Sequence, residues 1–226
     1  MAGMPMTKSK FDLILYDLDG TLQDSIPLIL ESFHAAYEAV FGSCTRTDED
    51  FMSYIGRPLT DTFEMHDEKT AKLLAVSYLA YNLAEMEKGR VPLFEGIEDM
   101  LEKIRDLGVK QGIVTSKLKS SALKTIEPLG LDKFMNVMIF REDTERAKPY
   151  GDPLVCAAQK LGIGDMGRVL YVGDAVHDIM SAKDCGASSA VVSWTKMPME
   201  DIDNLGPDFK IGAPSDLPCI IRAPEL

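Results

Sequence analysis

The sequence predicts an α/β fold: a Rossmann-like parallel sheet with helices on both faces and an inserted four-helix cap. Beyond residue 90, apolar runs typical of buried strands alternate with amphipathic helical patterns, as in right-handed crossover units. A block with only helical patterns interrupts this alternation directly after the first strand. We therefore expect a core domain formed by residues 1–22 and 90–226, and a cap domain formed by residues 23–89.

The first elements follow from short-range patterns. A strand is expected over Phe11–Tyr16, an apolar run that ends in the polar segment Asp17–Thr21. A helix is expected over residues 27–41, where apolar residues recur at helical spacing before Gly42. Further helical patterns cover residues 48–54, 59–66 and 70–87. We expect the Met and aromatic side chains of this block to form the core of the cap rather than a recognition surface. They include Met52, Phe63, Met65, Tyr78, Tyr81 and Met86.

The second half of the chain alternates between strands and helices. The expected strands are residues 109–114, 137–140, 168–172 and 189–192. The expected helices are residues 95–107, 120–129, 152–161 and 177–185. The tail from Met197, rich in Pro, Gly and Asp, is expected to hold an edge strand near residues 209–211 and a short helix near Leu217. Open α/β sheets bind ligands at the carboxyl ends of their strands, so an insertion after the first strand is placed to act as a lid.

Composition restricts the partners. The 36 acidic residues against 24 Lys and Arg give a net charge of -12, which repels nucleic acid and anionic lipid surfaces. We expect neither nucleic acid nor a membrane as a partner. A site for an anionic substrate must then create a local positive field, which makes a bound cation a physical expectation.

The sequence predicts a cytoplasmic location. No apolar run reaches the ~20 residues of a membrane-spanning helix, and Met1–Lys10 lacks the apolar region of a secretory signal. The cysteines are too widely spaced for a metal knuckle or a redox motif, so reduced thiols in a cytoplasmic protein are expected. They are Cys44, Cys156, Cys185 and Cys219. Nothing in the sequence indicates the oligomeric state.

Two aspartates follow the first strand. Asp17 and Asp19 share one side of the backbone, and Gly20 lets the chain turn sharply while leaving space for a ligand. One such carboxylate can attack as a nucleophile while the other, its pKa raised by its neighbour's charge, holds a proton for the leaving group. The alternative interpretation is a solvated acidic turn.

More aspartates follow a later strand. Asp174 and Asp178 come after Gly173, and their spacing of four places them on one face of a helix start. Like charges ~4 Å apart cost on the order of 4 kcal/mol per pair at an effective dielectric near 20. If these residues join Asp17 and Asp19, the cluster therefore requires a hard divalent cation, Mg²⁺ by preference. A helix-capping role is the alternative for either residue alone.

A cation and two hydroxyls complete the set. Lys148 is expected to face the transferred phosphoryl group and to screen it from Asp17. Thr115, with help from Ser116, is expected to donate a hydrogen bond to a phosphoryl oxygen. Taken singly, the lysine fits a surface residue and the threonine fits an ordinary strand end.

These four segments, in this order, resemble the four motifs of the haloacid dehalogenase superfamily. The motifs are Asp17–Thr21, Thr115, Lys148 and Gly173–Asp178. The resemblance spans nearly the whole chain and includes the helical cap between the first two motifs. It is greatest to the subfamily that contains phosphoglycolate phosphatases, pyrophosphatases and β-phosphoglucomutase.

The resemblance implies a magnesium-dependent phosphatase for a small phosphomonoester, similar to phosphoglycolate phosphatases. Asp17 would attack phosphorus, and Asp19 would protonate the leaving oxygen and then activate water. The metal would be held by the Asp17 carboxylate, the Asp19 backbone carbonyl and Asp174. Asp178 would act through water or by orienting Lys148.

Other features leave the substrate open. Tyr54–Pro58 resembles the substrate-specificity loop of the family, where Arg57 would clamp a carboxylate or a second phosphate, unless it is simply solvated. Gly151 stands where many relatives have a second proline, and Ser116 where an Asn is common. A phosphomutase similar to β-phosphoglucomutase and a non-catalytic protein that binds a phosphorylated ligand remain alternatives.

Overall fold

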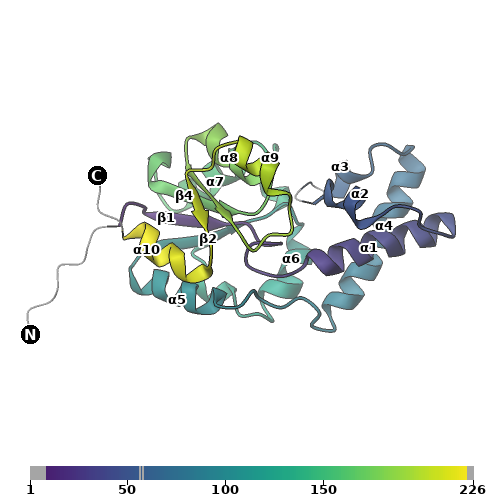
Figure 1. The fold of residues 1–226 in the computed structure, drawn as a ribbon, viewed down its shortest axis with the longest axis horizontal. Coiled ribbons are helices and arrows are strands. Elements are labelled where there is room, and N and C mark those ends of the chain that lie inside the picture. The colour runs from purple at the N-terminus through teal and green to yellow at the C-terminus, as the bar shows by residue number, and fades with distance from the viewer. Residues whose placement is uncertain (1–8, 56, 58, 223–226) are drawn as a thin grey trace, which may run out of the picture.

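The parallel sheet is the centre of the molecule. The computed structural model describes residues 9–55, 57 and 59–222 (Figure 1). Its 6-stranded sheet has the order β3-β2-β1-β4-β5-β6, and neighbouring strands run parallel. The strands are β1 (Leu13–Tyr16), β2 (Lys110–Val114), β3 (Val137–Ile139), β4 (Val169–Gly173), β5 (Ser188–Val192) and β6 (Phe209–Ile211). The predicted Rossmann-like α/β fold is therefore confirmed.

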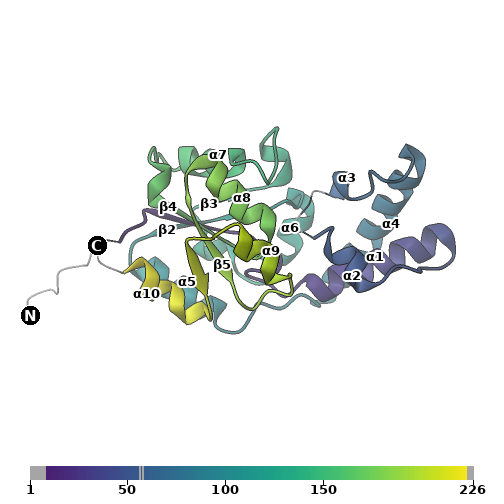
Figure 2. The same cartoon turned by 45° about the horizontal axis from the view of Figure 1, so that its top comes forward.

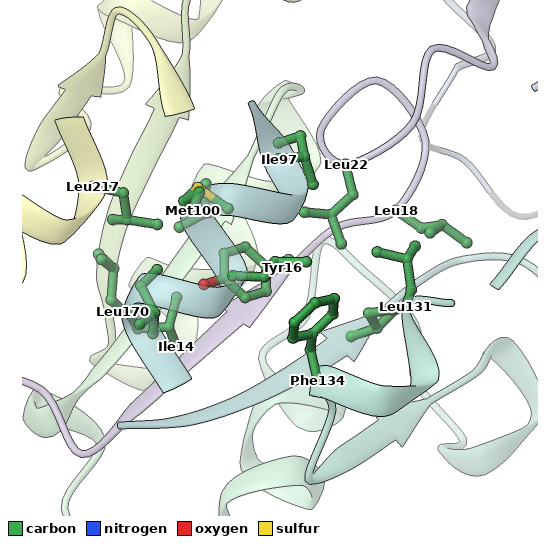
Figure 3. Close-up of a cluster of buried hydrophobic side chains, with 14 of the residues drawn as sticks. Ile14, Tyr16, Leu18, Leu22, Ile97, Met100, Leu131, Phe134, Leu170 and Leu217 are labelled. Carbon is green, nitrogen blue, oxygen red and sulfur yellow. The ribbon is translucent and has the colours of Figure 1, made fainter. Parts of the chain in front are cut away.

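Both faces of the sheet are buried. Alternate side chains of β1 point in opposite directions, so Ile14 and Tyr16 join one apolar cluster and Leu13 and Leu15 another. The cluster of Ile14 and Tyr16 appears in Figure 3. Its helices are α5 (Ile97–Asp106), α6 (Lys119–Ile126) and α10 (Leu217–Ile221). The opposite face is covered by α7 (Asp152–Lys160) and α8 (Val176–Cys185). Burial on both sides explains why the strands are almost continuously apolar.

Four helices between β1 and α5 pack around a cluster of their own. They are α1 (Ile26–Phe41), α2 (Asp48–Met52), α3 (Leu59–Thr62) and α4 (Glu68–Met86). Phe33, Phe51 and Leu74 lie at the centre of the cluster. In Figure 1 and Figure 2 this group extends from the side of the core opposite α10. The cap thus has an apolar cluster of its own. Its boundaries with the core, at residues 22/23 and 89/90, stay a prediction.

The predicted core of the cap is correct in most positions and wrong in one. Phe63, Tyr78 and Met86 are buried, and Met52 and Tyr81 are half-buried. Met65 is 58% exposed, and its sulfur accepts hydrogen bonds from Arg46 and Tyr54. The predicted helix over residues 59–66 ends at Thr62. Asp67 instead caps the next helix by accepting a hydrogen bond from the Thr70 amide, which leaves Met65 in the turn between the two.

A second difference lies in the tail. The sequence did not predict α9 (Met199–Asn204), because Pro198 and the acidic residues around it are typical of irregular segments. Ile202 anchors this helix by packing against Ile179 and Val191. The edge strand and the last helix are found where they were expected.

Two further expectations concern cysteines and membranes. All four cysteines lie in the described part of the chain, and each is a free thiol. Among the described residues, no helix has both the length and the apolar character needed to span a bilayer. Residues 1–8, on which the expectation about a signal segment rests in part, lie outside the described residues.

Candidate active site

The predicted site residues meet at the carboxyl edge of the sheet. Asp17 follows β1 and Asp174 follows β4, its neighbour in the sheet. The ladder continues past the strand ends, because the Asp17 amide donates to Val172 and the Thr115 amide donates to Ile139. This pairing holds the chain in register up to the residues that carry the functional groups. Side chains distant in sequence are thereby brought to one place.

Lys148 lies at the centre of the cluster. Its ammonium donates hydrogen bonds to Asp17 Oδ1 at 2.8 Å, to Asp178 Oδ1 at 2.7 Å and to the Tyr171 hydroxyl at 3.1 Å. The residue is only 4% exposed. Burial alone would lower its pKa, but the carboxylates of Asp17 and Asp178 raise the pKa of Lys148 well above its ordinary value. Lys148 is therefore a fixed positive charge beside the Asp17 carboxylate.

Asp178 is held by hydrogen bonds on both oxygens. Oδ1 lies within hydrogen-bond distance of Lys148 and of the Tyr171 hydroxyl, and Oδ2 accepts from the amides of Asp174 and Ala175 at 3.1 and 3.0 Å. This arrangement fixes the direction of Lys148 and the start of α8. The role of Asp178 in orienting Lys148 during the reaction stays a prediction.

Gly20 makes room for Asp174. Its φ is +77°, and a Cβ placed there would lie 2.2 Å from Asp174 Oδ2. Asp174 Oδ2 in turn accepts a hydrogen bond from Thr195 at 2.9 Å. The space that the sequence suggested for a ligand is therefore occupied by a carboxylate, which brings Asp174 against the loop of Asp17.

The acidic cluster lacks sufficient positive charge of its own. Burial raises the pKa of Asp17 to about 7; the Lys148 ammonium opposes this shift and the Asp178 charge adds to it. Burial, followed by the charges of Asp178 and Asp17, raises the pKa of Asp174 well above its ordinary value. Each residue of this trio offers a carboxylate oxygen, and these oxygens lie within 4.8 Å of one another. Such a set of buried oxygen ligands with surplus negative charge fits Mg²⁺.

Asp19 differs from the expectation. Burial would raise its pKa, but the Lys117 ammonium, together with hydrogen bonds from Lys117, Ser25 and Gln23, lowers the pKa of Asp19 below its ordinary value. Lys117 lies 2.8 Å from Asp19 Oδ1. The raised pKa predicted for one aspartate of this pair thus belongs to Asp17 in the structure. The Asp19 carboxylate does not belong to the metal-compatible trio, so its predicted contribution as a ligand rests on its backbone carbonyl.

Three partners in the site were missed from the sequence. Lys117 lies two residues after Thr115, so the alternation of an extended chain already placed both on one side. Tyr171 appeared as an ordinary residue of a buried strand, and Thr195 follows β5 without any motif. Their roles arise from contacts between separate elements, which spacing along the chain does not reveal.

A cavity of about 230 Å³ opens beside Asp17. Its floor includes Asp17, Asp19 and Lys148, and the predicted phosphate-binding residues Thr115 and Ser116 line it as well. Its cap side is mostly apolar. The cap residues there are Ile29, Phe33, Tyr54, Ile55, Leu59, Ala75, Tyr78 and Leu79, together with Arg57, Thr62 and Asn82. Arg57 is therefore at the cavity and exposed, while Gly56 and Pro58 of the predicted specificity loop lie outside the described residues.

The loop of Lys148 packs closely on α8. A Cβ at Gly151 would lie 2.5 Å from the Cys185 Cβ and 2.9 Å from the Cys185 amide nitrogen. The Gly151 amide donates to Asp184 Oδ2 at 2.8 Å. A proline at this position would lose that hydrogen bond and meet α8. The departure noted in the sequence is therefore compensated by close packing, and Lys148 still reaches Asp17.

Comparisons with known proteins agree on one family. A family model described as haloacid dehalogenase-like hydrolase matches residues 14–192. Pyrophosphatase PpaX from Anoxybacillus flavithermus is 35% identical over 209 residues, which cover 92% of this chain and 95% of the relative. Pyrophosphatase PpaX from Bacillus pumilus is 33% identical over 219 residues, which cover 96% of this chain and 100% of the relative.

Solved structures share the fold. A predicted phosphoglycolate phosphatase from Haemophilus somnus superposes with a TM-score of 0.82 at 22% identity, covering 94% of this chain and 98% of that chain. A haloacid dehalogenase-like family hydrolase from Streptococcus pneumoniae gives a TM-score of 0.81 at 23% identity, covering 92% of this chain and 97% of that chain. At these identities the likeness concerns the arrangement of the backbone.

Proposed function

The chain belongs to the haloacid dehalogenase-like hydrolase family, and on that premise we propose that it is a magnesium-dependent phosphatase for small phosphomonoesters that acts through an aspartyl phosphate. The observation that carries this proposal is the buried ammonium of Lys148, 2.8 Å from Asp17 Oδ1 at the floor of the cavity. A carboxylate is a weak nucleophile toward an anionic phosphate. A fixed positive charge beside it lets the two anions approach.

Asp17 is the proposed nucleophile. Its Oδ1 accepts the hydrogen bond from Lys148, and no hydrogen bond within the described residues uses Oδ2. Oδ2 is therefore the oxygen that attacks: the bond from Oδ2 to phosphorus forms while the bond from phosphorus to the ester oxygen breaks. Lys148 keeps its protons and offsets the charge that collects on the phosphoryl oxygens.

Asp19 is the proposed acid and base. In the ground state its carboxylate is held by Lys117, Ser25 and Gln23. To act, it must exchange the bond to Lys117 for one to the substrate and take up a proton from solvent, which it gives to the departing oxygen. The ionised Asp19 then accepts a proton from the water that attacks the aspartyl phosphate and releases that proton to solvent, which returns both aspartates to their starting state.

The phosphoryl oxygens are bound by neutral donors and by charge. The Thr115 hydroxyl oxygen accepts a hydrogen bond from the Lys117 amide at 3.2 Å, so its own hydrogen can be donated to the substrate. The carboxylates of Asp17 and Asp174, with the backbone carbonyl of Asp19, would hold Mg²⁺, which when bound supplies positive charge at the phosphoryl oxygens. Asp178 keeps Lys148 in place throughout.

Inorganic pyrophosphate is a second candidate substrate. The curated relatives described above are named pyrophosphatases, at 33% and 35% identity over nearly the full chain. A phosphomutase would use the same aspartyl phosphate but would pass the phosphoryl group to a sugar hydroxyl. The product separates these possibilities, because a phosphomutase releases an isomer and a phosphatase releases inorganic phosphate.

The test is phosphate release from a panel that includes phosphoglycolate, pyrophosphate and a sugar 1-phosphate, with Mg²⁺ and with excess chelator. We expect release with Mg²⁺, its loss with chelator, and a beryllium fluoride adduct on the wild type but not on Asp17→Asn. Turnover that persists in chelator, or an adduct that survives Asp17→Asn, would contradict the proposal.

We also infer a cytoplasmic protein that acts on small phosphorylated metabolites without nucleic acid. The net charge of -12 and the four free thiols support this inference. Fractionation of cells that express the chain tests the location.

A further inference from the structure

Arg141 lines the cavity at a distance from the reacting carboxylate. It begins the short 3₁₀ turn Arg141–Asp143, directly after β3 and Phe140. Its backbone amide donates to the Lys117 carbonyl at 3.0 Å, which ties this turn to the segment that carries Thr115. The residue borders the same cavity as Asp17. The sequence patterns gave this arginine no role.

The guanidinium of Arg141 has no counter-charge among the described residues. Its Nη1 donates to the Thr144 carbonyl at 3.3 Å, whereas its buried Nε has no hydrogen-bond partner. The carboxylates next to it in sequence are used elsewhere, because Glu142 accepts from the Lys119 amide and Asp143 from the Phe140 amide. A buried donor without an acceptor is unfavourable, so an anion at this position would stabilise the folded protein.

Arg146, in the following loop, shows the ordinary alternative. Its guanidinium pairs with Asp152 at 2.8 Å and lies against the Tyr150 ring. It does not border the cavity. An arginine of this region can therefore find a carboxylate within the chain. Arg141 has no such carboxylate among the described residues, and it borders the cavity.

The sheet separates Arg141 from the nucleophile. Asp17 follows β1 and Arg141 lies just beyond β3, with β2 between them. Neighbouring strands are spaced by about 4.8 Å, so the strand ends lie on the order of 10 Å apart. Part of this distance is bridged by the arginine side chain and the rest must be bridged by the ligand. An anion bonded directly to the reacting phosphate, as in pyrophosphate, would lie nearer to Lys117.

Apolar side chains line the intervening space. Leu118, which is 45% exposed, borders the cavity from the core, and Ala75 and Leu79 border it from α4. These surfaces suit carbon atoms rather than further charge. The lining of the cavity thus combines the charged groups around Asp17, the guanidinium-bearing Arg141 and apolar side chains.

We propose that Arg141 is a specificity-determining residue that binds a second acidic group of the substrate, several bonds away from the phosphate. The proposal deepens the proposed function and rests on it, since it takes the phosphate to lie at Asp17. It assigns the substrate class as phosphomonoesters whose alcohol part ends in a carboxylate or a second phosphate.

Binding of non-hydrolysable phosphonates to the Mg²⁺-loaded protein tests this assignment. The matched pair is propylphosphonate and 3-phosphonopropanoate, which differ by the terminal carboxylate. Isothermal titration calorimetry should show the carboxylate compound binding on the order of 10- to 100-fold more tightly, the range for a hydrogen bond to a charged group. Ethane-1,2-bisphosphonate replaces the carboxylate with a phosphonate, and whichever of the two binds more tightly identifies the terminal acid.

Variants assign the difference to Arg141. In Arg141→Gln the ratio of the two affinities should fall to near one, and Arg141→Lys should restore part of it. Arg146→Gln, the control from the neighbouring loop, should keep the full ratio. A ratio near one in the wild type, or a full ratio in Arg141→Gln, overturns the proposal. If Arg141→Gln does not fold, as judged by circular dichroism, the comparison rests on Arg141→Lys, where an unreduced ratio overturns it.

Failure of the proposed function would be seen separately. Hydrolysis of p-nitrophenyl phosphate, which carries no second acid, reports on the reaction at Asp17 alone. Absence of Mg²⁺-dependent hydrolysis with a normal affinity ratio would refute the phosphatase and retain the anion site. Mg²⁺-dependent hydrolysis together with an affinity ratio near one for the two phosphonates would refute the anion site and retain the phosphatase.

Discussion

The two walls of the cavity are built on different principles. The core wall consists of buried charged groups whose hydrogen bonds come from several elements, such as the contacts of Lys148 with Asp17, Asp178 and Tyr171. The cap wall consists largely of apolar side chains, with Arg57 exposed at its edge. A charge in the core wall is tolerated only with its partners in place, whereas an apolar contact can be exchanged for another of similar size.

This difference separates the reaction from the choice of substrate. A substitution in the core wall leaves a buried charge unmatched and should therefore affect catalysis. A substitution in the cap wall changes contact area and should affect substrate binding. If the comparison is right, the two kinds of variant fall into distinct kinetic classes, and the size of the effect decreases from the nucleophile outward.

The largest effect is expected for Asp17→Asn, which removes the proposed nucleophile. Turnover should fall on the order of 10⁴-fold or more, as for other enzymes that lose the attacking group. The fold should persist, because Lys148 retains its bond to Asp178. Phosphate release measures the loss, and circular dichroism tests the fold. A variant that keeps a tenth of the activity would exclude Asp17 as the nucleophile.

The same variant gives a pH dependence. Burial raises the pKa of Asp17 from 3.8 to about 7, so the folded chain keeps this proton to higher pH than the unfolded chain. In metal-free protein, the stability associated with the protonated carboxyl is present at low pH and is lost as pH rises toward 7. The difference between the melting temperatures of Asp17→Asn and the wild type should therefore shift in favour of the variant as pH rises from 4 to 7. Asp106→Asn, which removes a carboxylate from a side chain that is 74% exposed, is the surface control.

The next effect concerns the metal and sharpens the comparison within the core wall. Asp174→Asn removes a proposed ligand and should weaken Mg²⁺ binding by more than the 10- to 100-fold typical of residues that only orient a ligand. Thr195→Val, which removes the hydrogen bond to Asp174, should fall within that smaller range. Calorimetric titration with Mg²⁺ gives both values. Equal affinities in Asp174→Asn and the wild type would exclude Asp174 from the metal site.

The features that local sequence patterns predict are the fold and the floor of the site. Asp17, Thr115, Lys148 and Asp174 follow strands or precede a helix within recognisable local patterns, and a parallel sheet brings such positions together. The fold and the floor of the site were therefore accessible from short segments of the chain. The charge balance was also accessible, because four acids and one lysine in one place require a further cation.

The remaining contacts depend on packing between elements. The sequence left open which residue of the Asp17 and Asp19 pair has the raised pKa, because Lys117 was not recognised as the partner that lowers the pKa of Asp19. Met65 was assigned to the core because helical spacing could not show that α3 ends before it. A role for Arg141 could not be predicted from the sequence, because it depends on a buried Nε that has no hydrogen-bond partner, and this is visible only in the structure. Local patterns indicate which groups are present, whereas tertiary contacts determine their charge state.

An intermediate effect is expected for Lys117→Met, at the boundary between the walls. Asp19 would lose the contact that positions its carboxylate in the cavity, and kcat for an alkyl phosphate should fall roughly 10-fold, which is less than the 10²- to 10⁴-fold that general acid catalysis contributes in full. The loss should be smaller for p-nitrophenyl phosphate, whose leaving group needs no proton. Lys119→Met, whose ammonium lies over the Phe140 ring, is the control. An equal loss for both substrates would show that Lys117 acts on the phosphate rather than through Asp19.

The smallest effect is expected for Leu79→Ala, in the cap wall. The half-buried leucine borders the cavity from α4, and its truncation removes apolar contact worth on the order of 1 kcal/mol. KM for an organic phosphomonoester should rise roughly 5-fold at constant kcat, because this contact is equally present in the ground state and the transition state. Val76→Ala, 58% exposed on the same helix, should change neither value. If kcat instead fell as far as in Lys117→Met, the cap would contribute to the chemical step itself, and the division between the two walls would not hold.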